Sequence, residues 1–343
     1  MTPESIAVFG LGAWGSALAK LLVRNGHSVR LWGSSSGQRA RLQRDWTGEK
    51  AHRAVSVEDD LGVLMAQASH FLIAVPSRSF RATLSALRPA KHATMVWATK
   101  GFEAGSGKLL SEVMDEEHGP YRLSAAVSGP TFASEIARDL PASLTVASRH
   151  DATASMVAGW FRNDRLLVHT SRDVAGVQIG GATKNVMAVV TGISDGLGFG
   201  ANARAALITR GLEEITRLGV AMGARTETFQ GFAGIGDLVL TCTDDSSRNR
   251  RVGLGLGRGG KLSDVLAQIG QETEGVAAAR EIYHLARRFK IEMPVVEQVY
   301  RVLYEDKPPQ AAIKALFRGE PAQREPMGRQ VLPLRARLAA QGM

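Results

Sequence analysis

A glycine-rich segment near the start of the sequence restricts the fold most strongly. Gly10-Leu11-Gly12-Ala13-Trp14-Gly15 follows a short apolar run at 6–9 and precedes a helical pattern at 16–24. This G-x-G-x-x-G spacing allows a tight turn, a close approach of pyrophosphate to the backbone, and close packing of helix on strand. N–H groups at the helix start then attract phosphate. The segment predicts a dinucleotide-binding site that includes Gly10, Gly12 and Gly15.

The rest of the sequence divides into two halves of different character. Further strand patterns lie at 28–32, 71–75, 95–98, 125–127, 144–147 and 166–169. A strand, a helix and a strand within about thirty residues predict a βαβ unit and hence a parallel sheet. Beyond about residue 175 helical patterns dominate, at 181–191, 203–219, 262–269, 276–288 and 294–304, with one short strand pattern at 238–240. We therefore expect a doubly wound α/β Rossmann-type domain over 1–178 and an all-α domain over 179–343.

Composition narrows the class of partner. Lys and Arg number 42 against 33 Asp and Glu, a net charge of +9 that suits small anionic ligands as well as nucleic acid. The arginines are scattered, aromatic residues make up 6%, and zinc-finger and RRM signatures are missing, so we expect a small phosphorylated ligand and no nucleic acid. No run approaches the ~20 apolar residues of a membrane span, so we expect no stable membrane insertion.

The cysteine content and the first residues of the sequence indicate the cellular compartment. The single cysteine, Cys242, cannot form an internal disulfide, and no Cys/His cluster has metal-ligand spacing, so we expect no metal site. The first residues also lack a signal-peptide pattern. These features favour a reducing, cytoplasmic compartment, with Cys242 as a packed thiol rather than a nucleophile.

The end of the second predicted strand bears on cofactor choice. An NAD-preferring site usually carries Asp or Glu there to bind the ribose 2′-OH. Here Ser34 follows the strand, no acid lies between Arg24 and Asp45, and Arg39 and Arg41 are nearby. This pattern favours NADP(H) and leaves NAD(H) open, while a plain solvated loop is the alternative.

Two lysines are candidates for chemistry. Lys184 lies in a helical pattern at 181–190 that is apolar on nearly all sides. Because lysine is rarely buried without a partner or a purpose, it is a candidate for proton exchange, or else it pairs with an acid at the helix start. Lys100 follows a predicted strand, at the sheet edge where doubly wound folds bind ligands. The alternative for Lys100 is a solvated loop.

Three polar segments lie in similar positions. Ser128 to Phe132 ends another predicted strand, and Asp237 stands in an apolar stretch where it needs a donor such as an ammonium or serves as a helix N-cap. The run at 247–251 concentrates donors for a phosphate, although a basic solvated turn is the commoner outcome. The glycine-rich run at 253–260 follows no strand and is predicted to be a loop.

Five motifs in the second half occur together and in order. They are Gly-Gly-Ala-Thr-Lys-Asn at 180–185, Gly-Ile-Ser-Asp-Gly-Leu-Gly at 192–198, Ala-Leu-Ile-Thr-Arg-Gly at 206–211, Gly-Ile-Gly-Asp-Leu-Val-Leu-Thr-Cys-Thr at 234–243 and Ser-Arg-Asn-Arg-Arg at 247–251. With them the chain resembles the bacterial NAD(P)-dependent glycerol-3-phosphate dehydrogenase family, from the first strand to about residue 305.

The resemblance implies a function and a fold for the second half. The activity would be reversible reduction of dihydroxyacetone phosphate to sn-glycerol 3-phosphate, which feeds glycerophospholipid synthesis in the cytoplasm. The helical domain would be like the C-terminal domain of 6-phosphogluconate dehydrogenase. A homodimer is left open.

The same resemblance assigns roles residue by residue. Lys184 would exchange the proton, helped by Lys100 and Asp237. The remaining substrate contacts would be Gly129, Thr131, Ser247, Arg248 and Asn249. The nucleotide would be contacted by Ala13, Trp14, Ser34, Lys100, Ala133, Arg248, Glu272 and Glu274. Ala13 and Ser34 depart from the serine and the basic residue that the family often has there, and the second departure weakens the preference for NADP(H).

Two other functions are kept as alternatives. One is a related NAD(P)-dependent dehydrogenase of a hydroxy acid or a sugar acid, which would need groups that select carboxylate over phosphate. The other is a non-catalytic NADP-binding sensor, for which the two lysines would be dispensable. The complete set Lys100, Lys184, Asp237 and Arg248 argues against the sensor.

Overall fold

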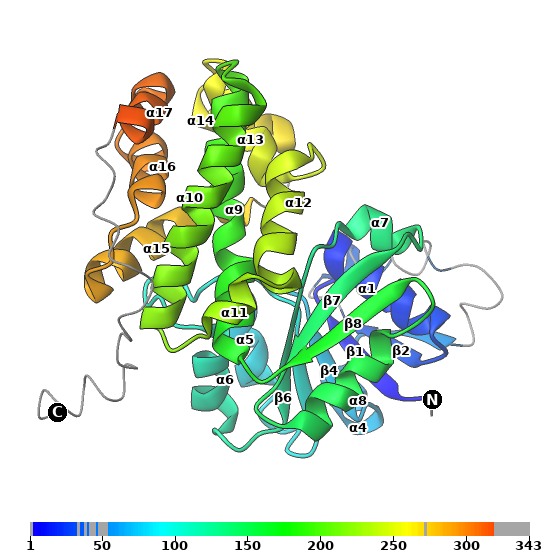
Figure 1. Ribbon diagram of the computed structural model, residues 1–343. Helices are drawn as coiled ribbons and strands as arrows, with labels where there is room; N and C mark the ends of the chain where they lie inside the picture. Colours follow the sequence, from blue (N-terminus) through cyan, green and yellow to red (C-terminus); the bar gives the residue numbers. More distant parts are fainter. Residues whose placement is uncertain are drawn as a thin grey trace, which may run out of the picture. The chain divides into compact units, whose positions relative to one another are not determined.

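The chain divides into two compact units. The computed structural model describes residues 3–32, 35–37, 40, 46, 54–270 and 273–318. Unit 1 comprises Met1–Glu103 and Lys108–Val177, and unit 2 comprises Ala104–Gly107 and Gln178–Met343. Figure 1 shows the sheet of unit 1 and the helices of unit 2.

Unit 1 is built on an eight-stranded sheet of order β3-β2-β1-β4-β5-β6-β7-β8. Its strands are β1 (Ser5–Phe9), β2 (Ser28–Trp32), β3 (Val55–Glu58), β4 (His70–Ile73), β5 (Thr94–Trp97), β6 (Ser124–Ser128), β7 (Ala142–Ala147) and β8 (Leu166–Ser171). The chain runs outward from β1 to β3 and then returns to β4 on the other side of β1. This reversal creates a topological switch point, and the glycine-rich segment follows β1 directly at that point.

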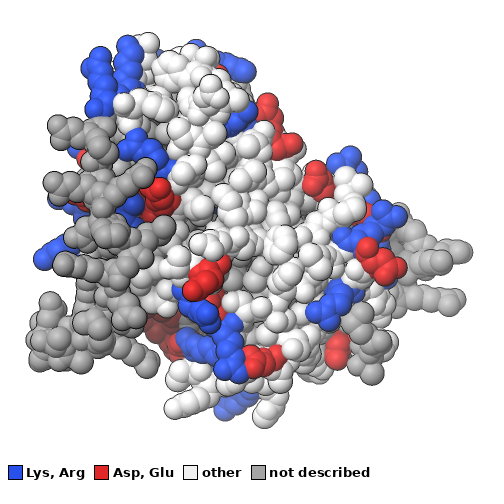
Figure 2. All heavy atoms as spheres, viewed as in Figure 1, with Lys and Arg blue, Asp and Glu red and all other residues white. Residues whose placement is uncertain are grey.

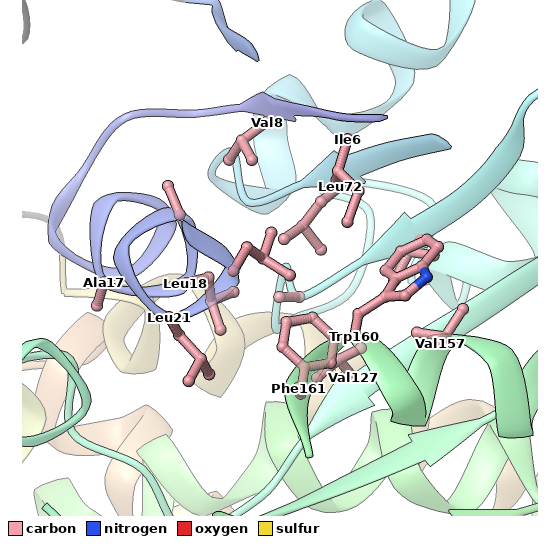
Figure 3. Close-up of a cluster of buried hydrophobic side chains, with 14 of the residues drawn as sticks. Ile6, Val8, Ala17, Leu18, Leu21, Leu72, Val127, Val157, Trp160 and Phe161 are labelled. Carbon is pink, nitrogen blue, oxygen red and sulfur yellow. The ribbon is translucent and has the colours of Figure 1, made fainter. Parts of the chain in front are cut away.

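Both faces of the sheet are covered by helices. Ile6 and Val8 pack on one face under α1 (Ala13–Arg24), α7 (Ala133–Ala137) and α8 (Asp151–Phe161), and Figure 3 shows side chains of α1 and α8 on these two residues. Ala7 and Phe9 pack on the other face under α4 (Leu61–Gln67), α5 (Ser77–Ala86) and α6 (Leu110–His118). Successive strand residues point to opposite faces, so this continuous apolar run serves two layers. The prediction of a doubly wound α/β domain is confirmed.

The sheet differs from the sequence prediction in two respects. The strand β3 was not predicted, because its sequence Val-Ser-Val-Glu is only four residues long and half polar. In addition, β6 and β7 pair antiparallel, while every other neighbouring pair is parallel. The link between β6 and β7 carries only the five-residue α7, and a parallel return normally needs a longer crossover.

The described residues of unit 2 form helices joined by loops and turns and contain none of the strands of the sheet, as predicted. It contains most of α9 (Val174–Gly196), then α10 (Gly200–Ala221), α11 (Thr226–Phe229), the π-helical segment η1 (Phe232–Gly236), α12 (Asp237–Thr243), α13 (Arg248–Gly257), α14 (Leu262–Ile269), α15 (Glu274–Phe289), α16 (Pro294–Tyr304) and α17 (Pro309–Arg318). The short strand predicted at 238–240 is wrong, because these residues lie within α12. Leu238 is buried and Val239 is exposed, and a three-residue apolar run cannot distinguish a helix from a strand.

The glycine-rich run at 253–260 was also predicted wrongly, since most of it forms α13 rather than a loop. A Cβ on Gly253 would lie 2.0 Å from the carbonyl oxygen of Val189 in α9. A Cβ on Gly192 of α9 would lie 2.2 Å from the carbonyl oxygen of Arg250 in α13. The two helices therefore touch backbone to backbone, and glycine is required for contact rather than for flexibility.

The α9–α13 contact makes Gly253→Ala destabilising. Alanine is the better helix former by about 1 kcal/mol, but its methyl group would collide with a backbone carbonyl, and overpacking costs about 1–3 kcal/mol. We expect urea denaturation to show a net loss of unfolding free energy. Gly255→Ala is the matched control in the same helix, because its methyl would meet the Val265 side chain at 2.7 Å instead of backbone. A Gly253→Ala protein as stable as the wild type would contradict the backbone contact.

A buried carboxylate joins α10 to α16. Glu214 is 1% exposed and accepts the backbone N–H groups of Val295 at 2.8 Å and Val296 at 3.2 Å, in the first turn of α16. Burial raises the pKa of Glu214 to about 7, because the desolvation of the charge outweighs these two hydrogen bonds and the nearby Arg217 and Arg210. Between pH 4.5 and about 7, the folded protein therefore holds a proton on Glu214 that the unfolded chain releases.

The sign of this shift predicts an unusual pH dependence. Because the folded pKa is raised, the contribution of Glu214 to stability is full below pH 4.5 and is lost as the pH rises to about 7. At about 1.4 kcal/mol per unit, the loss is on the order of 3 kcal/mol. Glu214→Gln imitates the protonated acid, so its unfolding free energy should rise relative to the wild type across this range. The exposed neighbour in Glu213→Gln should show no such trend, and a constant Glu214→Gln difference from pH 4.5 to 7 would refute the assignment.

Candidate active site

The glycine-rich segment in unit 1 has the geometry of a phosphate cradle. Gly10 has φ +92°, and a Cβ there would lie 2.6 Å from the backbone of Ala74, so only glycine makes this turn. A Cβ on Gly15 would lie 1.9 Å from the carbonyl oxygen of Gly10. At Gly12, by contrast, nothing lies within 4 Å of the Cβ position, and no side chain caps the start of α1. These residues fit a dinucleotide whose pyrophosphate rests over Gly12 at the positive end of the helix.

Trp14 ties the cradle to the neighbouring strand. Its indole Nε1 donates a hydrogen bond to the carbonyl oxygen of Ala98 at 3.2 Å, just beyond the end of β5. Lys100 lies two residues further along the same loop. The family resemblance placed Trp14 and Lys100 at the nucleotide, and the structure brings the first turn of α1 and the loop after β5 together at the carboxyl edge of the sheet.

The carbonyl oxygen of Gly129 accepts hydrogen bonds from two other predicted site residues. Lys100 Nζ donates to the carbonyl oxygen of Gly129 at 3.3 Å, and Thr131 Oγ1 donates to the same oxygen at 3.3 Å. Gly129 has φ +150°, and a Cβ there would lie 2.7 Å from the Ser143 carbonyl oxygen on β7. Lys100 is therefore oriented by the adjacent strand end and is not simply a solvated loop lysine.

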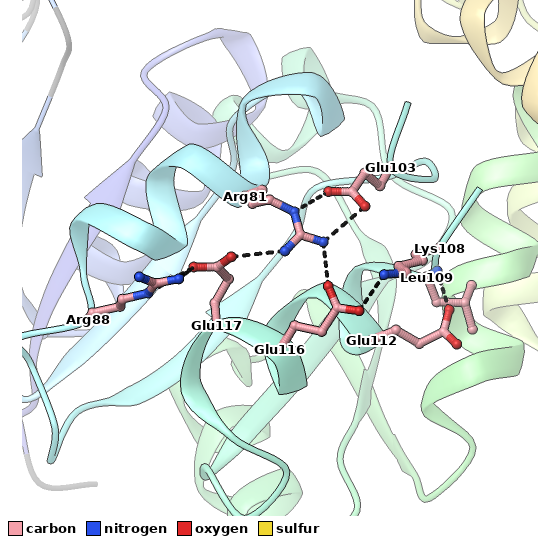
Figure 4. A network of polar contacts seen from close by, with 8 residues as sticks. All are labelled: Arg81, Arg88, Glu103, Lys108, Leu109, Glu112, Glu116 and Glu117. Carbon is pink, nitrogen blue, oxygen red and sulfur yellow. Dashed lines mark hydrogen bonds and ion pairs between the residues drawn. The ribbon is translucent and has the colours of Figure 1, made fainter. Parts of the chain in front are cut away.

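An ion-pair network supports the loop that follows Lys100, as Figure 4 shows. Arg81 of α5 contacts Glu103 at 2.5 Å, Glu116 at 2.6 Å and Glu117 at 2.9 Å, and Lys108 pairs with Glu116. The carboxylates of Glu103 and Glu116 raise the pKa of Arg81, with a smaller contribution from Glu117. Glu103 stands three residues after Lys100, so the network restrains the loop on both sides of 104–107.

Unit 2 contains a buried ion pair made by the two residues that the sequence singled out. Lys184 of α9 is 6% exposed, Asp237 at the start of α12 is fully buried, and Lys184 Nζ donates to Asp237 Oδ1. Lys184 is therefore buried and pairs with an acid, although it lies in the middle of α9 rather than at its start, and its part in proton exchange stays a prediction. The buried ammonium is matched by a carboxylate, as a charge in an apolar surrounding requires.

Two glycines allow this pair to form. A Cβ on Gly180 of α9 would lie 2.3 Å from the carbonyl oxygen of Ala233 in η1. Gly234 interrupts the helical geometry with φ −101° and ψ −106°, and a Cβ there would lie 2.2 Å from the carbonyl oxygen of Phe229. The close approach at Gly180 and the kink at Gly234 bring the first turn of α12 against α9. This is the local reason why Asp237 reaches Lys184.

The first turn of α13 carries the remaining substrate candidates. Ser247 is its N-cap and accepts the N–H of Arg250 at 3.2 Å. Asn249 is buried, and its Oδ1 accepts the N–H of Gly275 at 3.0 Å, next to Glu274 at the start of α15. This bond fixes the amide so that its two N–H donors lie on the other side. A basic solvated turn, the commoner outcome for such a run, is therefore wrong for 247–251, and Arg248 is half-buried.

Sequence reasoning missed the residues that set this geometry. Gly180, Gly234 and Gly275 each permit a backbone approach; a Cβ on Gly275 would lie 2.7 Å from both Asn185 O and Asn249 Oδ1. Their adjacency to Lys184, Asp237 and Glu274 in the sequence was the available signal. Arg250 was seen only as part of a basic run, although it is 6% exposed.

Several other predictions have simple outcomes. Cys242 is fully buried, and burial raises the pKa of its thiol to about 12, which confirms a packed thiol. Ala133 is the first residue of α7. Ser34, Arg39, Arg41 and Glu272 lie outside the described residues.

The described residues contain no group of three or more His, Cys, Asp or Glu side chains arranged to hold a metal ion. Within the same part of the chain, no helix has the length and apolar character needed to span a bilayer. On the face shown in Figure 2, the described basic and acidic side chains occur in small mixed groups rather than in one broad basic surface.

Together, the doubly wound sheet, the glycine cradle at its switch point and the helical unit with a buried Lys–Asp pair define a dinucleotide-dependent oxidoreductase of two domains. Family models then specify which one. The model described as the N-terminus of NAD-dependent glycerol-3-phosphate dehydrogenase matches residues 5–154, and the model of its C-terminus matches 173–314. The chain belongs to the NAD-dependent glycerol-3-phosphate dehydrogenase family.

Individual relatives agree with this family. The glycerol-3-phosphate dehydrogenase [NAD(P)+] of Thioalkalivibrio sulfidiphilus is 50% identical over 312 residues, which cover 89% of this chain and 94% of the relative. The enzyme of the same name from Methylococcus capsulatus is 47% identical, covering 92% and 97%. The crystal structure of glycerol-3-phosphate dehydrogenase from Coxiella burnetii matches with a TM-score of 0.87 and 38% identity, covering 92% of this chain and 99% of that one.

The buried ion pair predicts strong coupling between Lys184 and Asp237. Removal of one partner leaves an uncompensated buried charge, so Lys184→Met should lower the unfolding free energy by about 3–5 kcal/mol. The double variant Lys184→Met/Asp237→Asn removes both charges and should recover part of that loss. Denaturation of the two single variants and the double variant measures the coupling in a double-mutant cycle.

The exposed pair Arg225–Glu227 is the matched control, because its side chains are 71% and 72% exposed. A cycle on that pair should give a coupling energy close to zero, because solvent screens two exposed charges. If the Lys184–Asp237 cycle gave a value as small, the two side chains would not form a buried pair.

Proposed function

We propose that this protein reduces dihydroxyacetone phosphate to sn-glycerol 3-phosphate in a reversible, NAD(P)H-dependent reaction. The observation that carries the proposal is the buried Lys184–Asp237 pair, which lies within the match to the family. An ammonium held in an apolar surrounding by one carboxylate is a suitable proton donor for a developing alkoxide. The glycine cradle accounts for the nucleotide requirement.

The chain's own residues would divide the chemistry as follows. Gly10, Gly12 and Gly15, with the start of α1, hold the pyrophosphate, and the bound dinucleotide supplies the hydride. Lys184 donates a proton to the substrate oxygen in reduction and takes it back in oxidation. Asp237 orients the ammonium through their hydrogen bond. Lys100, oriented by the Gly129 carbonyl, adds positive charge where the oxygen becomes negative.

The phosphate of the substrate would be bound by the first turn of α13. Arg248 offers the planar fork of donors that suits phosphate, and the Gly275 bond occupies the oxygen of the Asn249 amide, which leaves its N–H groups as donors. Ser247, Gly129 and Thr131 complete the predicted substrate contacts. The nucleotide contacts of Ala13, Trp14, Ala133, Arg248 and Glu274 are proposed on the same basis.

For the cofactor we propose a preference for NADP(H), with NAD(H) also used. The acid that lies opposite the end of β2 is Glu58, which is paired with Trp32 in the strand register. Its carboxylate is occupied by Arg30 at 2.8 Å and by Ser56 at 2.7 Å. A carboxylate held in this way is poorly placed to select a ribose 2′-OH, which leaves room for a 2′-phosphate.

We also propose that the enzyme acts in the cytoplasm, supplies glycerophospholipid synthesis, and works without nucleic acid. A homodimer remains a prediction that light scattering on the purified protein would test. These statements extend the family resemblance.

The test is oxidation of NADPH, and separately of NADH, by the purified protein with dihydroxyacetone phosphate. We expect turnover that depends on this substrate and a higher kcat/KM with NADPH. Lys184→Met should lower kcat by about 10²–10⁴-fold, since it removes the proton donor, and it also controls for contaminating activity. Its loss of stability is separated from its loss of activity by assay of the folded fraction.

Three outcomes would contradict parts of this proposal. Nucleotide binding without turnover would remove the substrate assignment and favour a sensor, and turnover only with hydroxy acids or sugar acids would favour a related dehydrogenase. Near-normal turnover of Lys184→Met would remove the proton-transfer role. A higher kcat/KM with NADH would reverse the cofactor preference.

A further inference from the structure

Arg250 follows the proposed phosphate-binding residues on α13 but is buried itself. Its side chain is 7% exposed, whereas Arg248 is half-buried. A guanidinium is rarely buried unless its donors are matched. The proposed substrate and nucleotide contacts do not use Arg250, so its burial needs another explanation.

The contacts of Arg250 join three separate parts of unit 2. Its NH1 donates to Asp195 Oδ2 at 2.5 Å, near the end of α9, and to the carbonyl oxygen of Cys242 at 3.3 Å, near the end of α12. Its Nε donates to Asp245 Oδ1 at 2.8 Å, in the loop that connects α12 to α13. One rigid fork thus connects α9, α12 and the loop to the first turn of α13.

A second arginine also contacts Asp195 but makes a different link. Arg204 of α10 also donates to Asp195 Oδ2, at 2.6 Å, but this bond reaches neither α12 nor the loop. The other Asp195 oxygen, Oδ1, is buried and has no hydrogen-bond partner among the described residues. Asp195 therefore relies on Arg250 and Arg204 at a single oxygen, and only Arg250 extends that link to α13.

The backbone around Arg250 is equally constrained. Its N–H donates to the side chain of the N-cap residue Ser247. Its carbonyl oxygen lies so close to Gly192 of α9 that a Cβ on residue 192 would collide with it. The side chain and the backbone of Arg250 thus fix the first turn of α13 against α9. They also fix the path of the loop that connects α12 to α13. Ser247, Arg248 and Asn249 lie on that same turn.

We propose that Arg250 is a positioning residue for substrate phosphate: it holds the first turn of α13 so that Arg248 and Asn249 meet the phosphate group. The inference rests on the proposed function and deepens it. Arg250 touches neither ligand and acts through its neighbours. A displacement of about 1 Å in a binding group can change a rate by about 10²-fold, so a loosened turn should have a large effect.

The test compares Arg250→Lys with the wild type on two substrates, dihydroxyacetone phosphate and dihydroxyacetone, which lacks the phosphate. Lysine keeps a positive charge beside Asp195. Its single ammonium group cannot reproduce the several fixed donors by which the guanidinium reaches Asp245 and the Cys242 carbonyl. We expect kcat/KM for dihydroxyacetone phosphate to fall about tenfold or more, chiefly through KM. For dihydroxyacetone it should change less than about threefold, because that substrate does not use the phosphate site.

Two further variants keep the result interpretable. Arg204→Ala removes the other cation from Asp195 and should leave KM for dihydroxyacetone phosphate unchanged. Asp245→Asn weakens the loop link at a side chain that is 68% exposed, so it should fold even if Arg250→Lys does not. Asp245→Asn should raise KM for dihydroxyacetone phosphate, by a smaller factor than Arg250→Lys does.

The outcomes separate this inference from the proposed function. If the wild type fails to turn over dihydroxyacetone phosphate, the function and the inference both fail. If the wild type is active, equal losses on both substrates, or no loss on either, would overturn the positioning role alone. A rise in KM for Arg204→Ala as large as that for Arg250→Lys, or an unchanged KM in Asp245→Asn, would overturn it as well.

Discussion

The buried pair of Lys184 and Asp237 is the interaction on which the helical unit depends. An ammonium and a carboxylate taken out of water are each unfavourable alone, and the direct hydrogen bond between them offsets part of that cost. That requirement fixes where α12 must begin relative to α9. It also explains why the connecting segment η1 departs from regular helical geometry at Gly234. The burial of this ion pair and the packing of α12 on α9 thus depend on each other.

Glycine serves the same purpose at several places in the chain, which is to let two backbones or a backbone and a ligand approach. Gly15 packs against the Gly10 carbonyl, and Gly192 and Gly253 lie in the α9–α13 contact. Gly12 differs from these, because the space beside it is open and suits a pyrophosphate. A glycine count alone cannot separate these roles, since each is defined by what faces the missing Cβ.

Local pattern was sufficient where a residue's environment follows from its neighbours in sequence. The strand before Gly10 and the helix around Lys184 are continuously apolar, and the helix after Gly10 is apolar on one face, so each can be recognised from its own residues. The pattern failed where the partner is distant. The strand β3 is recognisable only through its pairing with β2, and the glycines at 253 and 257 lie in a helix whose backbone contacts α9.

The sequence by itself determined the glycine-rich segment of the cradle and the alternation of strand and helix patterns that makes a doubly wound sheet, and it supplied the residues that we propose for proton transfer and phosphate binding. Only the tertiary structure decided that Asp237 is the partner of Lys184, 53 residues away, and that Asn249 presents its N–H groups because Gly275 occupies its oxygen. It also decided that Arg250 is buried while Arg248, two residues earlier, is only half-buried. The physical reason is that periodicity encodes which face of an element is apolar, whereas the pairing of buried charges depends on which elements meet there.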